Sequence, residues 1–290
     1  PAHGTSGGDS RQQRVRQVFD NLRLRGTAVS EAKMLAAISY SEGSFSSTQT
    51  VDMVRLSWGI LSFQGGALMG VLRRLREQDP SVFRAYFEDY GITISERGRT
   101  PPATARATRE MSGRAEGVQS HEAYGVSDLL VYDHRARTWV SGNEGLAVIQ
   151  SDPRYQALFV AAGNTTAAQA AQMEAARASF VHSVRNEQLT FGSGASQHTL
   201  RVKDFVNSEV AMFCLVERKV ATGNIRFATA MFQAYLRDRQ IEAAALPDRP
   251  QTDIAAWVRS YSSGARWELA NNLEPAGVPA LSDSTYEGQV

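Results

Sequence analysis

Two carboxylic acids and a hydroxyl follow one another at short spacing in the first quarter of the chain. Glu42 directly precedes Gly43, Asp52 lies ten residues further on, and Ser57 follows after another five. Two carboxyl groups in unlike surroundings can hydrolyse a glycosidic bond, because one can protonate the leaving oxygen while the other acts on water or on the sugar. The elements around these residues decide whether they can do so.

Glu42 falls at the end of a helix expected from about Ser30 to Gly43. Met34, Ile38 and Glu42 are four residues apart, so their side chains share one face of that helix. Burial and the negative end of the helix dipole both disfavour a charged carboxyl at this position. We therefore expect Glu42 to hold a proton and to serve as a general acid. Gly43 is typical of the residue that ends a helix.

Asp52 falls in a polar stretch, where its carboxyl can stay ionised. A neutral acid beside an ionised one is the division of roles that glycoside hydrolysis uses. Ser57 would then help Asp52 to hold the attacking water. The alternative is structural: Glu42 pairs with an arginine such as Arg55, and Asp52 is an ordinary turn residue.

The segment from Glu42 to Ile60 resembles the catalytic segment of phage-type lysozymes. In that family a Glu ends a helix, an Asp lies in the following hairpin, and a Thr precedes Ile-Gly. The resemblance implies that Glu42 is the acid, Asp52 the base that positions water, and Ser57 its helper. This chain departs from the pattern, since Ser57 replaces Thr, Trp58 stands where an aliphatic residue is common, and Asp52 is offset by one position.

The second half is similar to the carboxyl-terminal lobe of chitosanase-type members of the lysozyme superfamily. The similarity consists of Asp-Pro, an aromatic residue, a Gln-rich helix and then Phe-Val-Asn-Ser-Glu-Val-Ala-Met-Phe-Cys. Together the two resemblances cover residues 28–90 by motif and 150–240 by pattern. They imply a muramidase-like hydrolase that cuts β-1,4 bonds of bacterial peptidoglycan, with inversion and without a metal or cofactor. Its partner would be the glycan strands of the cell wall.

Two other functions stay open. The first is a non-catalytic lysozyme-like module that binds glycan or takes part in the assembly of a phage, secretion or wall-associated protein. The second is a chitosanase, although a cationic substrate would favour an acidic cleft and the formal net charge is only +1.

Five residues around the carboxyl pair are candidates for binding sugar by hydrogen bonds or stacking. They are Tyr40, Gln49, Thr50, Arg55 and Gln64. Trp58 alternates with Leu56 and Ile60 and is expected in the core. Glu209 interrupts an apolar helical stripe. We expect it to be a buried structural residue bonded to Arg or Asn, and a cleft residue facing Glu42 is the alternative.

The composition excludes several classes of protein. All but three of the 31 Lys and Arg residues are arginines, but no pattern specific to nucleic acid accompanies them. Cys214 is the single cysteine and lies in an apolar run, so we expect a buried thiol. The five histidines are scattered, so no structural zinc is expected. No apolar stretch is long enough to span a membrane.

The predicted fold is mainly α, of the α+β kind, with two helical lobes and a small β-hairpin region beside the helix of Glu42. We expect a flexible segment 1–9, an N-terminal lobe 10–91, an insertion 92–145 that includes a hairpin, a helical lobe 146–274 and a tail 275–290. We expect no signal peptide in this chain, and the start at Pro1 leads us to expect a processed form or a piece of a larger polypeptide or delivery assembly. The implied place of action is the bacterial wall, reached by secretion, in the periplasm or by delivery from a phage or secretion system.

Individual elements follow from local signals. Asp79-Pro80 and Asp152-Pro153 each predict a helix start, with Asp as the cap and Pro in the first turn. Residues 44–64 are expected to form a small hairpin or sheet, and residues 128–140 a second hairpin with a turn near 134–136. One continuous helix is expected from about Leu200 to Ala221.

Overall fold

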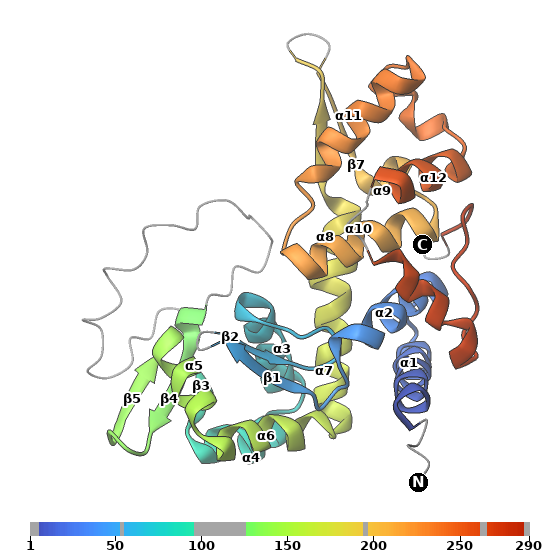
Figure 1. Ribbon diagram of the computed structural model, residues 1–290. Coiled ribbons are helices and arrows are strands. Elements are labelled where there is room, and N and C mark those ends of the chain that lie inside the picture. Colours follow the sequence, from blue (N-terminus) through green and yellow to red (C-terminus); the bar gives the residue numbers. More distant parts are fainter. Residues whose placement is uncertain (1–5, 53–54, 96–125, 194–196, 262–265, 287–290) are drawn as a thin grey trace. The chain divides into compact units, whose positions relative to one another are not determined.

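The structure is a computed structural model that describes residues 6–52, 55–95, 126–193, 197–261 and 266–286 (Figure 1). The described residues are mainly helical, with 66% of them in helices and 11% in strands, which confirms the expected mainly α class. The expected insertion falls largely on residues 96–125, which lie outside the described part.

The larger helices are α1 (Ser6–Leu24), α2 (Val29–Glu42), α3 (Gly65–Gln78), α4 (Pro80–Tyr86), α5 (Gly142–Ser151), α6 (Pro153–Gly163), α7 (Thr166–Ala176), α10 (Glu209–Thr222), α11 (Phe227–Arg239) and α12 (Gln251–Tyr261). The short helical elements are η1 (Glu88–Tyr90), η2 (Val126–Asp128), the π-helical turn η3 (Arg177–His182), α8 (Ser183–Asn186), α9 (Val202–Phe205), η5 (Ala243–Asp248), η6 (Trp267–Asn272) and η7 (Glu274–Ala276). The strands are β1 (Thr48–Asp52), β2 (Arg55–Trp58), β3 (Ile92–Ile94), β4 (Leu129–Asp133), β5 (Thr138–Ser141), β6 (Gln188–Phe191) and β7 (His198–Arg201).

The chain divides into two compact units. Unit 1 comprises residues 1–41 and 176–290, and unit 2 comprises residues 42–175. The expected lobes, 10–91 and 146–274, have other boundaries. The first two helices belong with the C-terminal half because their side chains bond to it: Arg16 donates to the carbonyl of Gly277 at 2.7 Å, and Lys33 pairs with Glu209.

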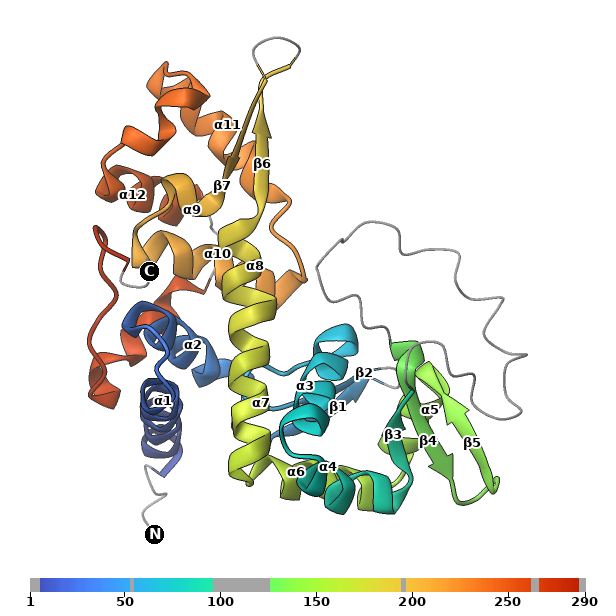
Figure 2. The same ribbon diagram turned by 180° about the vertical axis from the view of Figure 1, so that it is seen from behind.

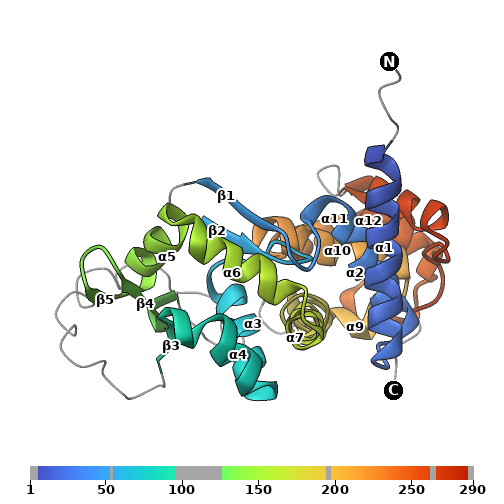
Figure 3. The ribbon, with the colours of Figure 1, turned by 90° about the horizontal axis from the view of Figure 1, so that it is seen from below.

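Unit 2 contains two antiparallel sheets and the helices that cover them. The β1–β2 hairpin contacts α3, α5 and α6, and the sheet β3–β4–β5 packs on α5 (Figure 3). Trp58 is fully buried at the centre, with its ring edge-on to Phe87 and Phe159 at centroid distances of 6.1 and 5.3 Å. The hairpins predicted over 44–64 and 128–140 are confirmed, and so is the core position of Trp58.

The two Asp-Pro helix starts in unit 2 are confirmed. The Asp79 carboxylate accepts the backbone N–H of Val82 at 3.0 Å, and Asp152 accepts that of Arg154 at 3.0 Å. Each proline occupies the first turn, where a missing N–H costs nothing. These caps fix where α4 and α6 begin.

Unit 1 is built around α10, which contacts α12, α8, η3 and η6 (Figure 2). Cys214 is fully buried on this helix, as expected.

The prediction of one helix over residues 200–221 is wrong. Residues 198–201 form β7, which pairs with β6, and the helical structure then breaks between Phe205 and Glu209. The break has a local cause, because the Ser208 side chain accepts the backbone N–H of Ala211 and starts α10 anew.

In the described part of the chain, every helix is too short or too polar to cross a bilayer.

Candidate functional site

Glu42 is the last residue of α2, as the sequence predicts. The helix ends there because Gly43 has φ +151°, which side-chain-bearing residues rarely adopt. A Cβ on Gly43 would also lie 2.9 Å from Cβ of Ser47 and 3.1 Å from the carbonyl oxygen of Gly59. Residues 42–64, called the 42–64 segment below, therefore fold back tightly on the end of α2.

Side chains of the 42–64 segment bind the backbone carbonyl of Glu42 at the helix end. The Ser62 hydroxyl donates to the Glu42 carbonyl at 2.7 Å, and the Gln49 amide donates to it at 3.5 Å. Carbonyls in the last turn have no partner within their own helix, so these bonds cap it. The Glu42 side chain is half-buried, between the sealed core and open solvent.

The turn after Glu42 is a serine cluster that is also joined to the far end of the segment. The Ser44 N–H donates to the Ser47 hydroxyl at 2.8 Å, and the Gly59 N–H donates to the Ser47 carbonyl at 2.9 Å. Trp58 and Phe63 exchange two backbone hydrogen bonds around the turn that contains Ser62. Both turns thus meet at the end of α2.

The β1–β2 hairpin carries a bulge in the strand of Asp52. Gln49 pairs with Ser57, but Asp52 pairs with Arg55, so β1 has one extra residue between the two pairs. Bulges re-aim side chains and are common near active sites. The backbone of Asp52 is thus placed at the hairpin's far end, while the side chains of Thr50, Asp52 and Arg55 lie outside the described part of the structure.

The other predicted site residues have different environments. Ser57 is only 3% exposed. Gln49 and Gln64 are exposed, and Gln64 directly precedes α3, where its carbonyl accepts the N–H of Ala67. Tyr40 is half-buried, belongs to unit 1 and has the Arg11 guanidinium 5.6 Å from its ring centroid. The 42–64 segment therefore brings Glu42, Gln49 and Ser62 together, and only the first two of these were predicted.

Sequence reasoning missed the residues that support the segment from outside it. Gln172 on α7 is fully buried and bonds to the backbone at Phe45 and Ile60. A Cβ on Gly163, at the end of α6, would lie 2.3 Å from the Phe45 carbonyl oxygen. The sequence did carry a signal for Gln172. This amide shares an apolar helix face with Ala168 and Ala176, and a polar side chain that is buried on such a face needs a hydrogen-bond partner.

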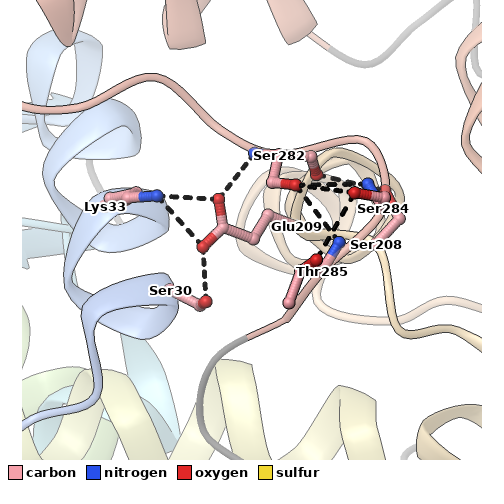
Figure 4. A network of polar contacts seen from close by, with 7 residues as sticks. All are labelled: Ser30, Lys33, Ser208, Glu209, Ser282, Ser284 and Thr285. Carbon is pink, nitrogen blue, oxygen red and sulfur yellow. Dashed lines mark hydrogen bonds and ion pairs between the residues drawn. The ribbon is translucent and has the colours of Figure 1, made fainter.

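Unit 1 contains a buried carboxylate at Glu209, as the structural interpretation expected. The side chain is 2% exposed, and its partner is Lys33 at 2.9 Å rather than Arg or Asn. The Ser30 hydroxyl and the Ser282 N–H also donate to it, the latter at 2.6 Å (Figure 4). A carboxylate with these partners is satisfied where it is, which gives no support to a cleft role.

Glu31 is a second buried carboxylate of unit 1, with its side chain 3% exposed. Arg177 donates to it at 2.9 Å, and His182 lies at 3.2 Å. Burial raises the pKa of this carboxyl, but the hydrogen bonds from His182 and Arg177 outweigh that effect, so its pKa lies below the ordinary value. Glu31 is therefore charged in the folded chain.

The described residues include no group of three or more His, Cys, Asp or Glu side chains placed to hold a metal ion.

Comparison with known proteins identifies no relative: no family description, curated protein or solved structure matches the chain.

Proposed function

We propose that the chain is a glycoside hydrolase of lysozyme-like fold that cuts β-1,4 bonds of bacterial peptidoglycan. Glu42 protonates the leaving oxygen, and Asp52 activates a water on the opposite face of the sugar ring. This arrangement requires the two carboxyl groups to lie roughly 6.5–9.5 Å apart and inverts the anomeric centre.

One observation carries the proposal: a half-buried Glu ends a helix whose last carbonyl is bound by side chains of the following hairpin segment. That bonding fixes the backbone of the acid through its carbonyl. A general acid needs such fixed placement, because proton transfer depends on reach and orientation.

Replacing Glu42 tests the proposal. Glu42→Gln keeps the size of the side chain but removes its acidic proton, so the rate of clearing of a cell-wall suspension should fall by roughly 10²–10⁴-fold. Glu144→Gln is the matched control, since Glu144 is an exposed residue of the same unit. Both variants should unfold at the wild-type temperature. Clearing by Glu42→Gln at the wild-type rate would remove Glu42 from the site.

A second candidate function is a non-catalytic glycan-binding or assembly module. The near-complete burial of Ser57 favours it, because a hydroxyl that helps to hold an attacking water must be reachable. This alternative predicts that the wild-type chain sediments with insoluble peptidoglycan and releases no reducing ends. Release of reducing ends by the wild type would reject it.

A further inference from the structure

Gln172 is a buried amide whose two ends are both bonded to the 42–64 segment. Its Nε2 donates to the Phe45 carbonyl at 2.8 Å, and its Oε1 accepts the Ile60 N–H at 3.2 Å. The side chain is fully buried, so no water competes for these bonds. Gln172 and the segment belong to the same compact unit, although more than a hundred residues separate them in sequence.

The amide of Gln172 lies directly against the backbone at Gly59. A Cβ on Gly59 would lie 2.2 Å from Oε1 of Gln172, so only glycine permits the amide to approach the chain there. Gly59 also has φ +87°, a backbone conformation that other residues rarely adopt, so it gives a second reason for glycine at this position. The amide is therefore held between the two turns of the segment.

A short series of bonds leads from Gln172 to the end of α2. Ile60 follows Gly59, whose carbonyl accepts the Ser62 N–H at 3.1 Å, and the Ser62 hydroxyl donates to the Glu42 carbonyl. On the other side, Phe45 lies in the serine turn that begins two residues after Glu42. Movement of either turn would change where the last residue of α2 lies.

We propose that Gln172 is a positioning residue for Glu42, which acts by joining the two turns of the 42–64 segment across the end of α2. Its catalytic consequence rests on the proposed function; its structural consequence does not. Gln172 touches backbone and not sugar, so its loss should lower kcat and leave KM within about twofold.

The variant Gln172→Glu distinguishes a hydrogen-bonding role of Gln172 from a role in packing alone. When protonated, the new carboxyl can donate its O–H to the Phe45 carbonyl and accept the Ile60 N–H, which restores both bonds. When ionised, it places a charged oxygen against the Phe45 carbonyl and breaks one of them. Burial favours the protonated form, so the two states should exchange within an accessible pH range.

The expected result is a kcat ratio of Gln172→Glu to wild type that is near one at about pH 4.5 and falls at least tenfold towards about pH 8. Gln172→Met, which forms neither bond, should be slow by a factor on the order of a hundred, with a pH-independent ratio. Gln169→Glu is the matched control, because it adds the same charge to α7 at an amide that donates to the Gly163 carbonyl, outside the 42–64 segment. Its ratio should stay near one. A flat ratio for Gln172→Glu, or a wild-type kcat for Gln172→Met, would overturn the proposal.

A second measurement separates this proposal from the hydrolase itself. Hydrogen exchange of the Ile60 amide, followed by NMR, should be at least tenfold faster in Gln172→Met than in the wild type. In Gln172→Glu the chemical shift of that amide proton should titrate with pH. If the wild type releases no sugar but these changes occur, the hydrolase fails and the placement of the segment stands. If Ile60 exchanges at the wild-type rate in Gln172→Met, Gln172 does not hold the segment.

Discussion

At the scale of single residues, the chemistry of a buried titratable group follows from what surrounds it. Cys214 is the simplest case. Burial raises the pKa of its thiol to about 12, so the reactive thiolate is almost absent at neutral pH.

Cys214 should therefore be unreactive in the folded chain. At pH 8 we expect no measurable reaction with a thiol-specific disulfide reagent over an hour, and reaction of one thiol per chain once urea unfolds the protein. Rapid labelling of the folded protein would show that α10 opens or that the thiol is not buried.

Glu31 gives a pH-dependent prediction. Its folded-state pKa is lower than in the unfolded chain, so its contribution is fully present above the unfolded value of about 4.3 and is lost as pH falls through the folded value. At pH 7, Glu31→Gln should lower the free energy of unfolding by about 3 kcal/mol, because Arg177 loses its buried partner.

The measurement for Glu31 is urea unfolding at pH 7 and again below pH 4. The difference between Glu31→Gln and wild type should shrink at the lower pH. Glu187→Gln, at an exposed position of the same unit, should match the wild type at both. A difference that grows on acidification would reverse the sign of the argument.

At the scale of elements, local sequence signals were sufficient wherever one short motif fixes a boundary. Asp-Pro gave the starts of α4 and α6, and the hairpin character of residues 128–140 gave the β4–β5 hairpin. The helix predicted over 200–221 was wrong because Val202, Val206 and Phe213 continue one apolar period across α9, a break and α10. Pairing of β7 with β6 and the Ser208 cap overrode that period.

The stabilising effect of the helix cap at Asp152 should depend on whether its carboxyl is ionised. Side-chain hydrogen bonds from Arg154, and then its backbone N–H, lower the pKa of Asp152 to about 2. The cap should thus keep its full strength above the unfolded value of about 3.9 and lose it as pH falls towards 2.

Asp152→Ala should cost about 1 kcal/mol at pH 7, and Asp152→Asn less, because an amide oxygen still accepts the N–H. Thermal unfolding of both variants at pH 7 is the measurement. Asp79→Ala, at the other Asp-Pro start, provides a parallel and should also lower the unfolding temperature. Equal stability of Asp152→Ala and wild type would mean that the start of α6 is fixed by packing alone.

The sequence predicted those parts of the candidate site that depend on residues close together in the chain. Glu42 at a helix end and a hairpin after it follow from spacing, and the structure has both. Gln172 could not be connected to them, because its partners are backbone groups of residues 45 and 60, which carry no sequence mark. The bulge at Asp52 is equally invisible in the sequence, since it is a property of pairing.

At the scale of the whole molecule, a buried ion pair joins segments of unit 1 that are distant in sequence. Glu209 joins α2 and the C-terminal segment to α10, through Lys33 and the Ser282 N–H (Figure 4). Removing one member of a buried ion pair leaves the other uncompensated, which costs more than removing both.

Lys33→Met should therefore destabilise the protein by about 3 kcal/mol, and the double variant Lys33→Met, Glu209→Leu by less than the sum of the two single changes. Urea unfolding of the four proteins at pH 7 gives the coupling directly. Strictly additive effects would show that the pair does not join these elements.

The central claim is that Glu42 is the acid of a wall-degrading hydrolase, and one measurement tests it most directly. Peptidoglycan is incubated with the purified chain in ¹⁸O-labelled water, and the soluble muropeptides are analysed by mass spectrometry. The account predicts fragments whose new reducing ends carry one ¹⁸O with the wild type, and none above the buffer control with Glu42→Gln. Identical labelled fragments from both proteins, or none from the wild type, would contradict it.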